Sequence, residues 1–70
     1  MKYGDYLKEH REKKGISQNE LAKQCGISQQ MISYCENNNG LPNIDFCVRL
    51  ADFYGISLDE LVGREFGHND

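Results

Sequence analysis

The sequence predicts an all-α fold of five short helices in a single domain. Ser and Asn residues that can start helices alternate with glycines that can end them, and apolar residues between them recur every three or four positions. No segment shows the apolar–polar alternation of a half-buried strand. Seventy residues are enough for one small core but leave little room for an extensive catalytic cavity.

The first helix is expected over residues 3–14, and Gly15 ends it in a left-handed conformation. One side of this helix holds Tyr3, Leu7, His10 and Arg11. Ser17 and Glu20 have the spacing of a capping box, in which each side chain accepts a hydrogen bond from the other residue's backbone. The second helix therefore starts at Ser17 and ends at Gly26.

Ser28 is expected to cap a third helix over residues 28–37, so that the two helices are only about three residues apart. Its apolar side holds Met31, Ile32 and Cys35. The following segment, NNNGLP, is a loop by composition, and Pro42 excludes a helix just before it.

Asn43 can cap a fourth helix from Ile44 to Tyr54, with Gly55 as its stop. The residues expected to face inward are Ile44, Cys47, Leu50, Ala51 and Tyr54. A second capping box, Ser57 with Glu60, opens a short fifth helix with Leu58, Leu61 and Val62 inward. The domain then spans residues 1–62, and residues 63–70 form a frayed tail.

The third helix has an uninterrupted polar face opposite its apolar side. This face holds Gln29, Gln30, Ser33, Tyr34 and Asn37. Short neutral amides and hydroxyls can pair with the donors and acceptors on base edges in a DNA major groove. An amphipathic surface helix also shows a polar outer face when it binds nothing, so this face alone leaves both interpretations open.

Ala22, Gly26 and Ile32 have the spacing of a helix-turn-helix, with a small residue at the contact, a glycine in the turn and an apolar anchor. The segments REKKGISQNELAKQCGISQQMISYCENN and LPNIDFCVRLADFYGISLDELVG resemble the Cro/phage-repressor (XRE-type) helix-turn-helix family. This resemblance implies a lambda-repressor-like DNA-binding domain of five helices, with the helix-turn-helix formed by helices two and three.

The resemblance implies that the third helix enters the major groove and that the start of the second helix contacts the DNA backbone. The base-contacting residues would be Gln29, Gln30, Ser33 and Tyr34, with an adenine opposite Gln29. The phosphate-contacting residues would be Gln18, Lys23, Ser28, Asn37 and Asn39. Arg11 and Glu36 would form a structural ion pair between the first helix and the end of the third.

The charge distribution departs from that of many family members. The net charge is −3 and the pI is about 5.2, with most of the acid in residues 44–70. Lys23 is the one basic residue on the expected DNA face. Because each neutralised phosphate contributes roughly −0.9 to the log–log salt slope, we expect modest affinity and a shallow salt dependence.

Two copies on a palindromic operator would compensate for the few contacts made by one domain. A surplus of apolar residues in the second half is a candidate pairing surface, with a homodimer expected through the C-terminal segments. The candidate interface residues are Phe46, Val48, Phe53, Val62 and Phe66.

The main alternative is a helix-turn-helix used as a protein-binding module, such as an antitoxin or regulatory partner. A second alternative is the DNA-binding part of a longer regulator. No catalytic constellation or phosphate loop is present, and three cysteines without a C-x-x-C pair indicate buried thiols rather than a metal site. We expect no enzyme activity, cofactor, metal, small-molecule site or membrane partner, and a cytoplasmic location.

Overall fold

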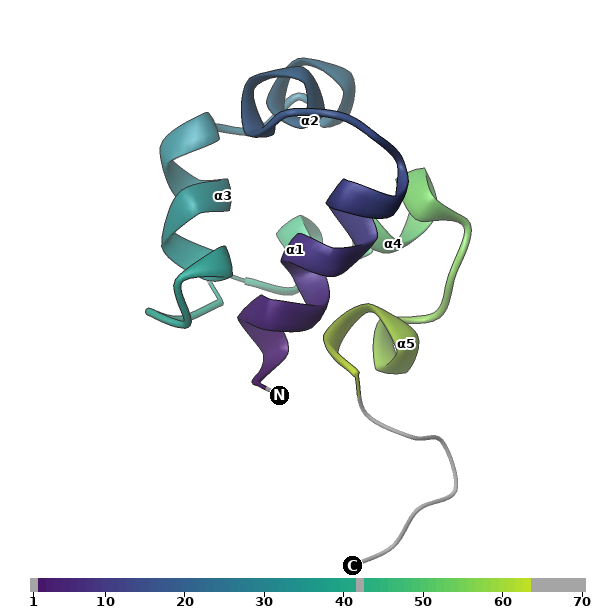
Figure 1. Cartoon of the computed structure of the whole chain (residues 1–70). Helices are drawn as coiled ribbons and strands as arrows, with labels where there is room; N and C mark the ends of the chain where they lie inside the picture. Colours follow the sequence, from purple (N-terminus) through teal and green to yellow (C-terminus); the bar gives the residue numbers. More distant parts are fainter. Residues whose placement is uncertain (1, 42, 64–70) are drawn as a thin grey trace, which may run out of the picture.

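The computed structural model describes residues 2–41 and 43–63, and every regular element within these ranges is a helix. The helices are α1 (Tyr3–Lys13), α2 (Gln18–Cys25), α3 (Gln29–Glu36), α4 (Ile44–Tyr54) and α5 (Leu58–Val62). In Figure 1, α2 and α3 lie above and to the left of α1, and α4 and α5 lie on its other side. The all-α prediction of five helices is confirmed.

The starts of α2 to α5 and the ends of α2 and α4 lie at the caps that the sequence predicts. Asn43 Oδ1 accepts the backbone N–H of Phe46 across 2.9 Å, and Ser28 Oγ accepts that of Met31 across 3.4 Å. Gly26 and Gly55 follow α2 and α4 with φ of 67° and 70°, a region in which glycine carries no Cβ penalty. These local signals fix where α3 starts relative to α2.

One of the two predicted capping boxes is complete and the other is half-formed. At α5, Ser57 and Glu60 bond reciprocally. At α2, Ser17 Oγ accepts the N–H of Glu20 across 3.1 Å, but the Glu20 carboxylate accepts Gln24 Nε2 across 3.0 Å instead of returning to Ser17. The reciprocal box at α2 was therefore a wrong prediction, because a carboxylate–amide pair one turn along the helix competes with it.

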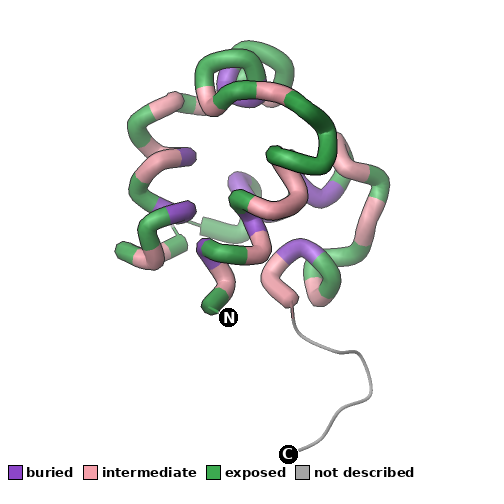
Figure 2. Tube along the Cα trace, viewed as in Figure 1, coloured by how far each residue is buried: buried purple, intermediate pink, exposed green. Residues whose placement is uncertain are grey.

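All five helices contribute to one hydrophobic core (Figure 2). Its buried members are Leu7, Leu21, Ala22, Ile32, Cys35, Phe46, Cys47, Leu50, Ala51 and Leu61. Leu21, Ile32 and Leu61 are almost fully enclosed. Because Ile32 anchors α3 to this core through one side, the opposite side of α3 is left for solvent or a ligand.

The structure corrects the predicted orientation of three apolar side chains. Phe46 was expected at a dimer interface but is 5% exposed and belongs to the core. Ile44 and Leu58 were expected to face inward but are 63% and 38% exposed. Ile44 and Leu58 are the first residues of α4 and α5, so they lie at the ends of their helices, whereas Phe46 lies two residues further along α4 and is buried.

Of the remaining interface candidates, Val48 is 39% exposed, Phe53 packs partly buried against the core, and Val62 is half-buried. Phe66, like Pro42 and the rest of the tail from residue 64, lies outside the described residues. No described helix has both the length and the apolar character needed to cross a membrane.

Candidate nucleic-acid interface

The helices α2 and α3 meet through a turn of three residues. Gly26 takes the left-handed conformation and the Ala22 carbonyl accepts the N–H of Ile27 across 3.0 Å. Ile27 packs partly buried against the core, while Ala22 and Ile32 are buried where the two helices meet. A small residue, a left-handed glycine and a buried anchor thus hold the two helices at the close approach of a helix-turn-helix.

The outer face of α3 is polar and accessible over the segment that the sequence predicts. Gln30, Tyr34 and Asn37 are exposed, and Gln29 and Ser33 are half-buried. Ser28 Oγ is engaged as the cap of α3, and the Asn37 amide donates to Ser33 Oγ across 3.4 Å. The face therefore combines free side chains with side chains whose orientation is already set by a neighbour.

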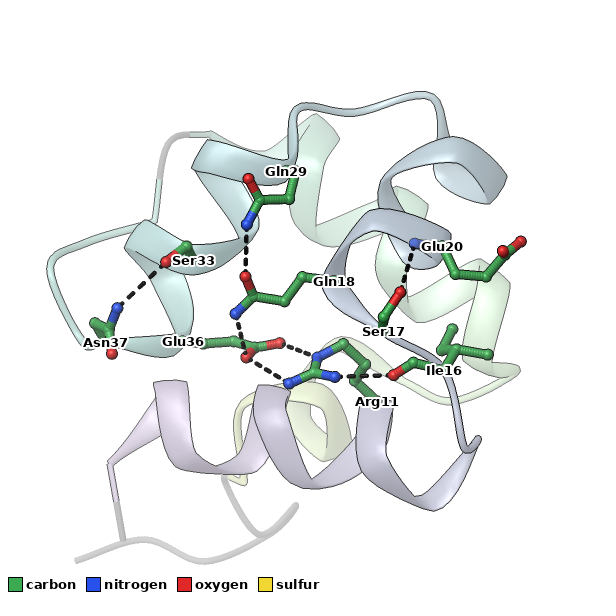
Figure 3. A network of polar contacts seen from close by, with 9 residues as sticks. All are labelled: Arg11, Ile16, Ser17, Gln18, Glu20, Gln29, Ser33, Glu36 and Asn37. Carbon is green, nitrogen blue, oxygen red and sulfur yellow. Dashed lines mark hydrogen bonds and ion pairs between the residues drawn. The ribbon is translucent and has the colours of Figure 1, made fainter.

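Gln29 belongs to a hydrogen-bonded chain of side chains that crosses three helices (Figure 3). Its Nε2 donates to Gln18 Oε1 across 2.7 Å, and Gln18 Nε2 donates to Glu36 Oε1 across 3.0 Å. The chain links the first residue of α3, the first residue of α2 and the last residue of α3.

The far end of this chain is the predicted ion pair between α1 and α3. Arg11 Nε donates to Glu36 Oε2 across 2.7 Å, and Arg11 Nη2 donates to Glu36 Oε1 across 3.1 Å. The Glu36 side chain is 4% exposed and that of Arg11 12% exposed, and Arg11 Nη1 also donates to the Ile16 carbonyl across 2.8 Å. The hydrogen bond to Glu36 raises the pKa of Arg11 above its ordinary value, against the opposing effect of burial.

Sequence reasoning placed Gln18 and Gln29 in separate roles and missed that they bond to each other. Each residue follows a capping serine directly, so each is the first residue of its helix. That shared position was the available signal, because the starts of the two helices lie close together in this helix-turn-helix. Gln18, Gln29, Glu36 and Arg11 are called the amide–carboxylate chain below.

Lys23 and Asn39 are exposed, and neither side chain has a hydrogen bond or ion pair within the described residues. Tyr34 is 47% exposed, and its ring lies against Gly40, where an added Cβ would come within 3.2 Å of the ring. Tyr34 also lines a mostly apolar notch of about 230 Å³ together with Ser28, Gln30 and Met31. The tyrosine thus forms one wall of a recess on the polar face of α3.

Arg49 on α4 is a second side chain whose role sequence reasoning missed. Its Nη1 donates to the carbonyls of Gly26 and Cys25 across 3.1 and 3.4 Å. These carbonyls end α2, where the backbone acceptors have no partner within their own helix. Arg49 therefore stabilises the turn between α2 and α3, and its guanidinium is already engaged there rather than free to bind a phosphate.

Comparison with known proteins identifies this arrangement. Residues 7–61 match a protein family described as Helix-turn-helix. The chain belongs to the helix-turn-helix family. This membership confirms the resemblance of the sequence to Cro/phage-repressor (XRE-type) regulators.

Two curated helix-turn-helix relatives and one solved structure match nearly the whole chain. The chain is 31% identical to the HTH-type transcriptional activator BcrR of Enterococcus faecalis, over 93% of this chain and 32% of that protein. It is 36% identical to the cryptic phage CTXphi transcriptional repressor RstR of Vibrio cholerae, over 91% of this chain and 57% of that protein. The chain thus spans about a third of the first relative and just over half of the second.

A crystal structure of a transcriptional regulator from Listeria innocua superposes with a TM-score of 0.78 at 25% identity, over 97% of this chain and 64% of that chain. The helix-turn-helix fold is therefore shared over the length of the described helices.

Proposed function

We propose that the chain is a sequence-specific, double-stranded DNA-binding transcriptional regulator, acting as a repressor, and that α3 contacts bases in the major groove. The observation that carries this proposal is the amide–carboxylate chain, which orders Gln29 at the leading end of α3. A side chain held in one orientation before binding loses less conformational entropy when it pairs with a base.

The hydrogen-bonding capacity of Gln29 is compatible with adenine. A glutamine amide has two N–H donors and one carbonyl acceptor, and the bond to Gln18 uses one donor. The second N–H can donate to adenine N7 while the carbonyl accepts from adenine N6. The pairing with Gln18 therefore leaves the two groups that a bidentate contact needs.

The same count applies to Gln18, which we propose as a phosphate contact. Its carbonyl accepts from Gln29 and one N–H donates to Glu36, so one N–H remains. Gln18 begins α2, where unpaired backbone amides and the helix dipole favour an anion. A single phosphate there would bind to the side chain and the helix start together.

Around this pair, we propose that Gln30, Ser33 and Tyr34 contact neighbouring bases. The proposed backbone contacts are Lys23, Ser28, Asn37 and Asn39. Because Lys23 is the one proposed contact that carries a positive charge, affinity should change little with salt compared with regulators that use several cations.

We further propose that two copies bind a palindromic operator as a homodimer. The exposed apolar side chains of α4, Ile44 at 63% and Val48 at 39%, lie one helical turn apart and support an interface on this helix. Val48 was already a candidate from the sequence. Ile44 takes the place of Phe46, which is buried in the core. A symmetric pair requires the same patch on both copies.

The experiment that tests the proposal is enrichment of duplexes from a random pool by the purified chain. We expect a recovered motif with an adenine at one position of each half-site and two-fold symmetry. A pool that stays random after repeated rounds contradicts sequence-specific binding. A promoter–reporter assay with the recovered site then tests repression, and increased expression would contradict it.

The exposed apolar residues of α4 also favour a second candidate function, a helix-turn-helix module that binds another protein, as an antitoxin or regulatory partner does. The two functions differ in the role of α3. If a protein partner binds with unchanged affinity after Gln29→Ala and no duplex is enriched, the protein-binding function is supported instead.

A further inference from the structure

The start of α1 is capped by a side chain from a distant part of the chain. Lys2, the residue before α1, supplies no side-chain hydrogen bond to the first turn. Instead, Asn38 Oδ1 accepts the backbone N–H of Gly4 across 2.8 Å, over 34 residues of sequence. This bond, called the cross-helix cap below, satisfies one of the amides that a helix start leaves without a partner.

The cross-helix cap depends on a close approach between two helix ends. Gly4 is buried, and an added Cβ would overlap the carbonyl oxygens of Cys35 and Glu36, at the end of α3. Only a glycine fits at this contact. The amino-terminal end of α1 and the carboxyl-terminal end of α3 carry opposite partial charges, so their contact is also electrostatically favourable.

Asn38 takes an unusual backbone conformation to reach Gly4. Its φ is 64°, the one positive value among the described residues other than glycine. The N–H of Asn38 donates to the Cys35 carbonyl and the N–H of Asn39 to the Tyr34 carbonyl, across 3.0 and 3.1 Å. This is the Schellman pattern that ends a helix, with asparagine at the position that glycine usually fills.

The cap has a consequence for the two neighbouring asparagines. With the Asn38 side chain directed to α1 and half-buried, Asn37 and Asn39 are both exposed. A glycine at position 38 would adopt the same backbone conformation at least as easily. The asparagine therefore adds something that the turn itself does not require, namely a fixed attachment of residues 37–39 to α1.

We propose that Asn38 is a positioning residue for DNA binding: through the cross-helix cap it fixes residues 37–39, so that Asn37 and Asn39 are presented to the DNA backbone. The proposal rests on the proposed DNA-binding function. Asn38 itself does not touch DNA. Without the cap, residues 37–39 become ordered only when DNA binds. The conformational entropy that they then lose offsets part of the binding free energy of their contacts.

The first test measures the cap without DNA. In Asn38→Gly, the left-handed turn is retained and the acceptor for Gly4 is lost. Amide hydrogen exchange followed by NMR should show the Gly4 N–H at least about tenfold less protected than in the parent chain. In Asn38→Asp, a carboxylate oxygen can accept the same N–H, and protection should be kept. Unchanged protection of the Gly4 N–H in Asn38→Gly would contradict the hydrogen bond between Gly4 and Asn38.

The second test measures positioning by a double-mutant cycle on a duplex recovered from the random pool. Asn39→Ala should weaken binding roughly three- to tenfold in the parent chain, the value of about one hydrogen bond. In the Asn38→Gly background the same change should weaken binding less than about twofold, because the loop is no longer held. In the Asn38→Asp background the full factor should return, although the added charge weakens binding overall.

A matched control separates positioning from stability. Ser57→Ala removes a comparable cap, at α5, where Ser57 Oγ accepts the N–H of Glu60 across 3.1 Å. It should leave affinity within about twofold of the parent chain and leave the factor for Asn39→Ala unchanged. An equal factor for Asn39→Ala with and without Asn38 overturns the positioning role. A parent chain that enriches no duplex contradicts the proposed function, while the exchange experiment still decides the cap.

Discussion

The side-chain amide of Gln29 donates a hydrogen bond across 2.7 Å to the side-chain carbonyl of Gln18. The two residues begin consecutive helices, so the bond joins the side chain proposed to contact a base to the side chain proposed to contact a phosphate. Gln18 is held in turn by Glu36, and Glu36 by Arg11. The orientation of Gln29 is thereby set in part by α1, which lies behind the helix-turn-helix.

Gln18→Ala and Gln29→Ala should affect DNA affinity in a coupled way. Each substitution is expected to weaken binding to the selected duplex about tenfold, because each removes one polar contact and releases its partner. The double variant should weaken binding roughly ten- to thirtyfold, well short of the product of the two effects. Titrations by fluorescence anisotropy measure this. Gln24→Ala, on the exposed side of α2, is the control and should change affinity less than about twofold.

Arg11→Ala should destabilise the fold, because it leaves the Glu36 carboxylate buried without its charged partner. Loss of one member of a buried pair costs about 3 kcal/mol in the free energy of unfolding. Lys13→Ala is the matched control, since the pair of Lys13 with Glu9 is exposed at 3.7 Å and should contribute less than about 0.5 kcal/mol. Urea denaturation measures both, and equal effects would contradict a structural role for Arg11.

The two faces of α4 should respond differently to truncation. Phe46→Ala removes a core ring and should lower the free energy of unfolding by about 3–5 kcal/mol. The combined change Ile44→Ala with Val48→Ala removes exposed apolar surface and should cost less than about 1 kcal/mol. On DNA, this double variant should bind a single half-site normally but lose the extra affinity for the two-fold site. Unchanged affinity for the two-fold site would rule out α4 as the interface.

Tyr54→Phe should stabilise the protein. The Tyr54 hydroxyl is buried and has no hydrogen-bond partner among the described residues, so its removal relieves an unpaired polar group, by about 1 kcal/mol. Burial also raises the pKa of the Tyr54 phenol above its ordinary value of 10. An unfolded tyrosine then loses its proton before a folded one, so this residue favours unfolding as the pH rises above 10. Thermal melts at neutral and alkaline pH should show a smaller alkaline loss in Tyr54→Phe, and an identical loss would contradict this.

The helix boundaries could be predicted because their signals are local. Ser28, Asn43 and Ser57 cap the helices that follow them, and Gly26 ends α2, each through contacts within a few residues. Such contacts are encoded by spacing alone. The start of α3, which positions the proposed base-contacting residues, can therefore be predicted from the sequence.

The inward face of α4 was harder to predict. At about 100° per residue, Phe46 and Ile44 lie about 70° and 90° from the centre of the stripe formed by the buried residues of α4, on opposite margins. Periodicity alone hardly distinguishes two such positions. Their burial is decided by how α4 packs against the rest of the core, which includes Phe46 and leaves Ile44 exposed.

The polar contacts between residues far apart in the chain could not be predicted from the sequence. The bond between Gln18 and Gln29 and the cap on Gly4 by Asn38 join residues 11 and 34 positions apart. Glutamine and asparagine on a surface are compatible with many partners or with water alone. Only the positions of the helices decide which amides meet. The predicted pair of Arg11 and Glu36 was an exception, since it came with the family resemblance.

The most direct measurement is the affinity of Gln29→Ala with Gln30→Ala for the selected duplex and for a scrambled duplex, at matched salt. We predict that the ratio of the two affinities falls at least about thirtyfold, while the affinity for the scrambled duplex changes less than about threefold. The thermal melting temperature should stay close to that of the parent chain. A folded double variant that keeps the parent's preference for the selected duplex would contradict the proposal that α3 recognises bases through these two glutamines.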